Sequence, residues 1–165
     1  SYAELRGQTA CDLCSTGSFV ATTGATTCTL CEKGEYQDEH GQTSCKTCSD
    51  GKTTDSRGMS KGTSCKCPAG SFLGLDNLTC QTCPAGMECP FGSEYINIAL
   101  YAADSSLVIP LVKAGYFTHR SSPLSVYMCN EADSNACPGG APETCGNGRV
   151  GLICEVCPEG QALSN

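Results

Sequence analysis

The sequence predicts a small disulfide-rich fold, mostly β and irregular: an elongated array of stacked disulfide-closed hairpin loops, a small antiparallel sheet module and a C-terminal cysteine-rich loop. Three observations predict it. Leu, Ile, Val and Phe make up only about 16% of the residues, below the roughly 20% at which an apolar core becomes doubtful. The chain has 16 cysteines in 165 residues, the density of a covalent scaffold. Those cysteines also recur at a regular spacing.

The first cysteines form CxxC pairs that recur every 17 residues, at Cys11, Cys14, Cys28, Cys31, Cys45 and Cys48. The loops between successive pairs begin Cys-x-x-Gly, and in three of them an aromatic residue follows: Phe19, Tyr36 and Phe72. The glycine can turn the chain with a positive φ, and the aromatic ring can cover the disulfide. The pattern therefore predicts residues 1–89 as an array of cysteine-rich loops.

The simplest pairing closes each of these loops on itself. In the chain-entropy model a loop of this size gains roughly 3 kcal/mol from its crosslink. Spacing alone leaves interleaved pairing open as the alternative. The five expected pairs are Cys14–Cys28, Cys31–Cys45, Cys48–Cys65, Cys67–Cys80 and Cys83–Cys89.

Residues 90–128 contain no cysteine and are predicted to form a small antiparallel β module. The string "YINIALY" alternates, which would place Ile96, Ile98 and Leu100 on one face of a strand. "SLVIPLVKAGYF" is a second apolar run, in which Pro110 indicates a sheet edge or a bulge. "LSVYM" is a short third strand. This segment has the aliphatic residues for a conventional core.

The run from Cys11 to Cys89 resembles the cysteine-rich repeats of ephrin-receptor and tumour-necrosis-factor-receptor type, in which Cys-x-x-Gly-x-Tyr/Phe opens a disulfide-closed loop. The later strings "VKAGYFTHRSSPLSVYMCNEADSNACPGG" and "CGNGRVGLICEVCPEG" are similar to a block that accompanies such repeats in large surface proteins of algae and other protists, including mastigoneme-like flagellar-hair proteins. The form CxxGxxGxxC also resembles the closing loop of an epidermal-growth-factor-like (EGF-like) module. These resemblances imply an EGF-like segment at residues 129–165, with the pairs Cys129–Cys137 and Cys145–Cys154.

The cysteine count places the chain outside the cytosol, because disulfides persist only in oxidising compartments. The sequon Asn77-Leu78-Thr79 agrees with this and predicts an N-linked glycan on Asn77. A net charge of −7 argues against nucleic acid and against anionic membrane surfaces as partners. The sequence has no apolar run long enough to span a bilayer, so we expect no direct membrane insertion. We expect an extracellular protein, secreted or on a cell surface, with the flagellar surface as one such location.

Three strings match catalytic motifs without their structural setting. "GNGRVG" matches GxGxxG, but Cys145 and Cys154 bracket it and leave no room for the flanking strand and helix. "GMSKG" matches GxSxG, yet His40 and His119, the two histidines, lie in polar loop-like sequence. "DGKTT" resembles the end of a P-loop but has Lys46 where the upstream glycine belongs. We expect no enzymatic activity and no cofactor.

Zinc is the main alternative to the disulfides, because C-x2-C-x13-C-x2-C has zinc-ribbon spacing. The sequon, the loop motifs and the CxC at Cys65 and Cys67 favour disulfides. Redox catalysis by CxxC would need a thioredoxin-like βαβ setting, which the pattern lacks. "CNEADSNAC" carries oxygen ligands for calcium but not the spacing of an EF-hand loop. We therefore predict no metal site. The threonine-rich "ATTGATTC" is either an O-glycosylated surface or a turn-rich filler.

Cys11 and Cys157 have no partner in this pairing scheme, because each belongs to half a loop. Either the chain is a window on a longer array, or Cys157 of one copy bonds Cys11 of the next. We expect a non-catalytic extracellular structural or adhesive rod within a larger glycosylated surface or filament-forming protein. Its partners would be other copies, or other parts of the same long protein. The alternative is the ligand-binding ectodomain of a cell-surface receptor.

Overall fold

The computed structural model describes residues 12–129 and 135–156. The chain divides into two compact units, which are described separately below. Unit 1 extends to Pro68 and includes Leu78–Cys80, whereas unit 2 holds Ala69–Asn77 and the chain from Gln81 onward. The divisions that the sequence predicts, after residues 89 and 128, stay a prediction.

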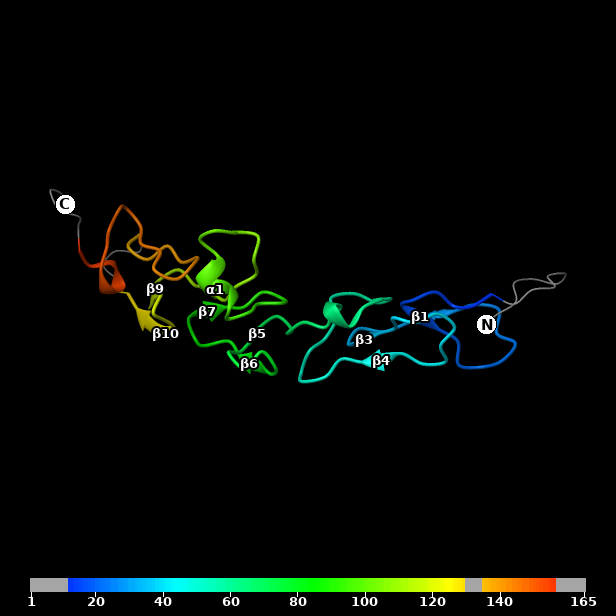
Figure 1. The fold of residues 1–165 in the computed structure, drawn as a ribbon. Coiled ribbons are helices and arrows are strands. Elements are labelled where there is room, and N and C mark those ends of the chain that lie inside the picture. Colours follow the sequence, from blue (N-terminus) through cyan, green and yellow to red (C-terminus); the bar gives the residue numbers. More distant parts are fainter. Residues whose placement is uncertain (1–11, 130–134, 157–165) are drawn as a thin grey trace. The chain divides into compact units, whose positions relative to one another are not determined.

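Unit 1 is built from two-residue strands paired as small hairpins (Figure 1). Strand β1 (Ser18–Phe19) pairs antiparallel with β2 (Thr29–Leu30), and β3 (Glu35–Tyr36) pairs in the same way with β4 (Lys46–Thr47). A 3-10 turn, η1 (Gly62–Ser64), follows them. Strands this short have little stability of their own, so the disulfides and the contacts between loops must hold them.

The hairpins of unit 1 share one register when residues are counted from the opening cysteine of each loop. Ser18 pairs with Leu30 in the first loop, and Glu35 pairs with Thr47 in the second. Each pair joins the fourth and the sixteenth residue after the opening cysteine. The repeat seen in the sequence is therefore also a repeat of backbone pairing.

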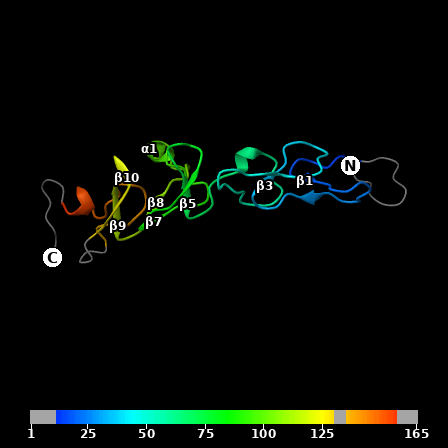
Figure 2. The same cartoon turned by 90° about the horizontal axis from the view of Figure 1, so that it is seen from below.

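Unit 2 contains three further two-stranded sheets, β5–β6, β7–β8 and β9–β10 (Figure 2). Strand β6 begins at Cys80, where the two units meet along the sequence. The elements are β5 (Ser71–Leu73), β6 (Cys80–Thr82), β7 (Met87–Glu88), α1 (Asn97–Leu100), β8 (Leu111–Val112), β9 (Tyr116–His119), β10 (Ser122–Met128) and η2 (Leu152–Cys154).

The buried cluster of unit 2 is mostly made of disulfide sulfur. Phe117 from β9 packs with Cys129, Cys137 and Cys154, while the partly buried Cys145 lies against them. Strands β9 and β10 lie side by side in both views (Figures 1 and 2). The cluster therefore joins the predicted β module to the segment that follows it, and β7–β8 joins the module to the loop that precedes it.

The prediction of a strand at "YINIALY" is wrong, because the segment contains the helical turn α1. Ile98 is buried, whereas Ile96 and Leu100 are 49% and 54% exposed. The extended pairing ends at the first residue of this segment, where the backbone of Leu73 bonds to Ser93 and Tyr95. No further strand partner is described there, so the backbone closes onto itself in a turn. Three alternating apolar residues are too few to distinguish the two periods.

The predicted fold class is confirmed. The described residues form a small, mostly strand and irregular structure with small two-stranded sheets and almost no helix. Within the predicted β module, the second and third apolar runs do form strands, as β8, β9 and β10. Pro110 lies directly before β8, outside the ladder.

Candidate functional site

The disulfides are the most prominent chemical feature of the described residues. The structure joins the same cysteines that loop closure and the EGF-like resemblance paired, and none of the pairs is interleaved. Their Cα–Cα distances run from 5.5 Å to 6.5 Å, within the normal range for a disulfide. The seven pairs are Cys14–Cys28, Cys31–Cys45, Cys48–Cys65, Cys67–Cys80, Cys83–Cys89, Cys129–Cys137 and Cys145–Cys154.

The two sulfurs of a CxxC belong to different loops. Cys28 closes the first loop and Cys31 opens the second, with two residues between them. A zinc ribbon would instead bring two such pairs together around one ion. Among the described residues, no group of three or more His, Cys, Asp or Glu side chains is placed to hold a metal ion.

A tight turn follows the opening cysteine in each of the first three loops. In the first loop the amide of Ser18 donates to the carbonyl of Ser15, and Gly17 between them has φ +80°. The carbonyl of Gly17 then accepts a hydrogen bond from the amide of Cys31, at 3.0 Å. The Cys-x-x-Gly motif thus turns the chain and aims a carbonyl at the cysteine that opens the next loop.

Backbone hydrogen bonds also connect neighbouring loops of unit 1. The amide of Gly41 donates to the carbonyl of Cys14 at 2.8 Å, and the amide of Gly58 donates to the carbonyl of Cys31 at 2.8 Å. Both bonds span 27 residues, so one contact between loops is repeated. We name these contacts the loop junctions of unit 1.

The closest approach at these junctions is between two glycines. A Cβ added to Gly17 would collide with the backbone carbonyl of Gly58. Leucines lie against the two glycines that donate at the junctions: the same construction brings a Cβ on Gly41 against Leu13, and one on Gly58 against Leu30. The glycines are therefore needed for packing between loops as well as for their turns.

Two buried polar residues lie at equivalent places, six residues after an opening cysteine. Gln37 is 2% exposed; its side-chain Nε2 donates to the carbonyl of Ser44 at 2.7 Å, and its Oε1 accepts from the amide of Glu39. Its backbone carbonyl accepts from the amide of Gly17, while its amide donates to the carbonyl of Met59. Gln37 thus connects three successive loops.

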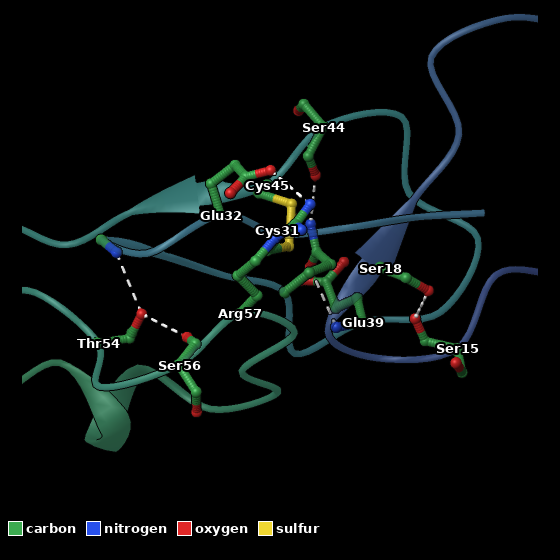
Figure 3. Close-up of a disulfide and its surroundings, with 12 residues drawn as sticks. Ser15, Ser18, Cys31, Glu32, Glu39, Ser44, Cys45, Thr54, Ser56 and Arg57 are labelled. Atoms are coloured by element: carbon green, nitrogen blue, oxygen red, sulfur yellow. Dashed lines mark hydrogen bonds and ion pairs between the residues drawn. A yellow bond between two sulfur atoms is a disulfide. The ribbon is translucent and has the colours of Figure 1, made fainter.

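Thr54 occupies the equivalent position in the third loop. Its Oγ1 accepts a hydrogen bond from the amide of Gly34 at 3.1 Å and donates to the carbonyl of Ser56 at 2.9 Å (Figure 3). The Thr54 hydroxyl thus accepts from the Gly34 amide, just as the backbone carbonyl of Gln37 accepts from the Gly17 amide. The sequence analysis missed both residues, although aligning the loops on their opening cysteines would have placed them together.

Exposed ion pairs cover the outside of the same loops. Lys46 Nζ lies 2.6 Å from Asp38 Oδ1 and 2.9 Å from Glu39 Oε1. Figure 3 shows the other pair, in which Arg57 contacts Glu32. The hydrogen bond from Lys46 holds the pKa of Asp38 below its ordinary value. The bonds to Asp38 and Glu39 raise the pKa of Lys46. All these groups are exposed, so their contribution to stability is small.

The predicted glycan site lies in the turn between β5 and β6. Asn77 is exposed and has φ +54°, and its amide donates to the carbonyl of Gly74 at 3.1 Å. The flanking residues Leu75 and Leu78 are also exposed. An oligosaccharide on the Asn77 side chain would therefore point into solvent. The glycan itself stays a prediction.

The histidine that the sequence analysis considered as a base, His119, lies at a surface hollow of about 350 Å³. Its Nδ1 lies 2.7 Å from Ser121 Oγ and accepts from the Ser121 amide, while Nε2 lies 3.2 Å from Glu143 Oε1. A serine, imidazole and carboxylate in series can activate a nucleophile. Here the Ser121 contacts form within one exposed turn, two residues from the histidine. The sequence did not reveal this arrangement.

Three other predictions concern parts of the chain that the structure does not describe in full. Cys11 and Cys157, for which no partner within the chain is predicted, lie outside the described residues. No helix in the described part of the chain is long and apolar enough to cross a membrane. Most of the acidic loop "CNEADSNAC" also lies outside the description, at residues 130–134.

Comparison with known proteins agrees with the geometry of unit 1. A family model described as tyrosine-protein kinase ephrin type A/B receptor-like matches residues 17–65. This segment is an ephrin-receptor-like cysteine-rich repeat, as the loop motifs predict. No curated protein matches the chain. The matched segment ends at Cys65, so it spans the second and third disulfide loops and most of the first.

Proposed function

We propose that the chain, an extracellular-type cysteine-rich module, is a non-catalytic structural or adhesive segment of a larger extracellular protein. The serial connection of its disulfide loops carries the proposal. Along the sequence the first four closed loops are separated by only two, two and one residues. The first three of these loops also bond to their neighbours through the loop junctions. Such local coupling suits a protein that transmits force or holds other domains apart rather than one that encloses a substrate.

The partners that we propose are other copies of the chain or other parts of the same long protein. An N-linked glycan on the exposed Asn77 would keep that turn hydrated. The net charge of −7 favours neither nucleic acid nor an anionic membrane as a partner. We place the protein outside the cell, secreted or on a cell surface. Its resemblance to protist surface proteins favours a surface such as that of a flagellum.

Self-association of the oxidised chain tests the structural role. Light scattering over a wide concentration range should show a mass that rises above that of the monomer. A sample reduced and alkylated at every cysteine is the control, and it should lose the association together with its loops. A mass that stays monomeric at the highest concentration would contradict assembly from copies of this chain.

A ligand-binding receptor ectodomain is the second candidate, and exposed apolar side chains favour it. Val150 and Leu152 are exposed and line the hollow beside His119. An apolar patch next to charged groups suits a foreign protein partner. The distinguishing result would be saturable binding of a monomeric chain to cells, weakened by Leu152→Glu and unaffected by Leu30→Glu in unit 1.

The absence of catalysis is part of the same proposal. Ser121 and His119 are exposed, and a nucleophile usually needs a site that excludes water around the reacting group. A fluorophosphonate probe should label wild-type protein no more than Ser121→Ala. Labelling of the wild type that disappears in Ser121→Ala would overturn the non-catalytic assignment.

A further inference from the structure

Residues 112–129 have the spacing of a disulfide loop without its disulfide. The first loop reads Cys14-x-x-Gly17-x-Phe19, closes at Cys28 and is followed by Cys31. The later segment has Val112, Gly115 and Phe117 at the first three positions, Val126 at the closing position and Cys129 at the last. Every offset is the same, and the two cystine positions are valines.

The strand register of this segment matches the register of the true loops. Tyr116 pairs with Met128, and Phe117 pairs with Tyr127. Counted from Val112, Tyr116 and Met128 are residues four and sixteen, and Phe117 and Tyr127 are residues five and fifteen. Ser18 with Leu30 and Phe19 with Thr29 have the same positions counted from Cys14. The agreement is therefore in three dimensions as well as in sequence.

The hydrogen bonds of the loop are also reproduced. The amide of Cys129 donates to the carbonyl of Gly115 at 2.9 Å, as the amide of Cys31 does to that of Gly17. The amide of Tyr116 donates to the carbonyl of Lys113, which closes the same turn. Gly115 has φ +83°, close to the value at Gly17.

The junction contact to a following glycine is present too. The amide of Gly140 donates to the carbonyl of Val112 at 2.8 Å, as in unit 1 the amide of Gly41 donates to the carbonyl of Cys14. The Gly140 bond spans one residue more than the bonds of unit 1. Packing contacts take the place of the missing crosslink. Val112 is buried and pairs with Met87, while Val126 lies so close to Gly86 that a Cβ there would sit 2.7 Å from it.

We propose that residues 112–129 are a further copy of the disulfide-closed loop in which Val112 and Val126 replace the cystine. Because this copy has no crosslink, residues 90–128 are the segment that lengthens when the oxidised chain is under tension. A disulfide carries tension across its loop, so only residues outside the closed loops can lengthen. Between successive disulfides up to Cys83–Cys89, one or two residues lie outside the closed loops. Between Cys89 and Cys129 there are 39, and between Cys137 and Cys145 there are seven.

The extension would be large and reversible. At roughly 3.3–3.6 Å per extended residue, 39 residues supply a contour length of about 130 Å. The hydrophobic and hydrogen-bonded contacts of the segment can re-form when the tension falls, because no covalent bond breaks. The ability to extend follows from the fold alone, whereas its use in a stretched assembly rests on the proposed structural function.

Single-molecule force extension of the oxidised chain, with the double variant Val112→Cys/Val126→Cys, tests the inference. The variant should form a 112–126 disulfide, detected by non-reducing peptide mapping, beside the seven existing pairs. Its unfolding step should be shorter than that of the wild type by roughly 40 Å, or about a third, because the 13 residues inside the new loop no longer extend. The single variant Val126→Cys should keep the full wild-type length.

Two results would overturn the proposal. Failure of the introduced cysteines to join while the seven native pairs form would show that residues 112 and 126 are not cystine positions. An unfolding step in the wild type far below about 100 Å, or one that the new disulfide leaves unchanged, would show that residues 90–128 are not the extensible segment. A monomeric mass in light scattering with the expected shortening would remove the assembly role alone.

Hydrogen exchange of the wild-type protein provides a test that needs no variant. The amides of Cys129 and Gly140 should be protected from exchange, as their counterparts Cys31 and Gly41 are expected to be, because each makes the repeated backbone bond. Fast exchange at Cys129 and Gly140, with protection at Cys31 and Gly41, would contradict the equivalence even if the double variant failed to fold.

Discussion

The backbone amide of Gly17 donates a 2.7 Å hydrogen bond to the carbonyl oxygen of Gln37, and this bond joins two different disulfide loops. Gly17 turns the first loop, and Gln37 is buried within the second. The covalent bonds close loops but do not order one loop against the next. Contacts such as this one supply that order, and they can be tested individually.

Gly17→Ala should destabilise the protein strongly. An alanine there would adopt an unfavourable φ of +80°, and its Cβ would also collide with the carbonyl of Gly58. Gly24→Ala is the matched control, because Gly24 has φ +81° but nothing within 4 Å of an added Cβ. We expect the backbone term alone, about 1–2 kcal/mol, for Gly24→Ala and a clearly larger loss for Gly17→Ala. Denaturant unfolding without reductant measures both, and equal losses would contradict the close approach.

Thr54→Val should cost about 1–3 kcal/mol of unfolding free energy, because it leaves the half-buried amide of Gly34 without its acceptor. The shape of the side chain is nearly unchanged, so the loss reports the hydroxyl. Thr54→Ser keeps the hydroxyl and should retain most of the stability. Chemical denaturation of the two variants decides the matter, and a serine variant as unstable as the valine variant would argue against the hydrogen bond.

Thr118→Val should be neutral or stabilising, by up to about 1 kcal/mol. Within the described residues, Thr118 Oγ1 is the buried side-chain polar atom that has no hydrogen-bond partner, and the residue is 0% exposed. Replacing an unpaired buried hydroxyl by a methyl group removes a desolvation cost. Thermal unfolding of the oxidised variant is the measurement. A marked drop in the unfolding temperature would show that the hydroxyl has a partner in solution.

The carboxyl of Asp38 should titrate below its ordinary value of 3.8, because Lys46 donates a hydrogen bond to it. A pKa lowered in the folded state means that the pair stabilises the fold above the ordinary carboxyl pKa, and that this contribution disappears as the pH falls through the folded value. Lys46→Met should return the Asp38 pKa toward 3.8. Carboxyl chemical shifts followed by NMR over acid pH report it, and an unchanged midpoint in Lys46→Met would contradict the assigned cause.

Asn77 should carry an N-linked glycan when the chain is made by secretion from a eukaryotic cell. The side chain is exposed in a turn, and Leu78 and Thr79 complete the acceptor sequence. Peptide mass spectrometry should find a sugar-bearing Asn77 peptide that becomes unmodified in Asn77→Gln. Thr79→Ala should abolish the modification as well, whereas Thr82→Ala, just beyond the sequon, should leave it intact. An unmodified wild-type peptide would contradict the prediction.

The loop pattern could be predicted because cysteine spacing and turn chemistry are local. Gly17 and Gly34 each follow their opening cysteine by three residues, and both take a positive φ in the turn that this spacing requires. The pairs Cys14–Cys28 and Cys31–Cys45 join residues close in sequence, so the shortest loops were also the ones formed.

The features that the sequence predicted wrongly or did not reveal depend on residues that are distant in the sequence. Ile98 alternates with Ile96 and Leu100, yet this segment lacks a described strand partner, and only Ile98 is buried. The hollow beside His119 needs Glu143, which is 24 residues away. A short apolar run does not carry the information that decides between a strand and a turn.

The sequence by itself predicted the simplest loop closures, the turns that open them and the class of fold, because each rests on residues within about twenty positions of one another. The structure then decided that none of the described cysteine pairs is interleaved. The tertiary structure alone decided which backbone groups meet between loops, as Gly17 meets Gln37, and which polar side chains are buried, as Thr54 is. It alone also identified Val112 and Val126 as the counterparts of a cystine. Valines carry no chemical mark of that role, and only the shared register and hydrogen bonds make it visible.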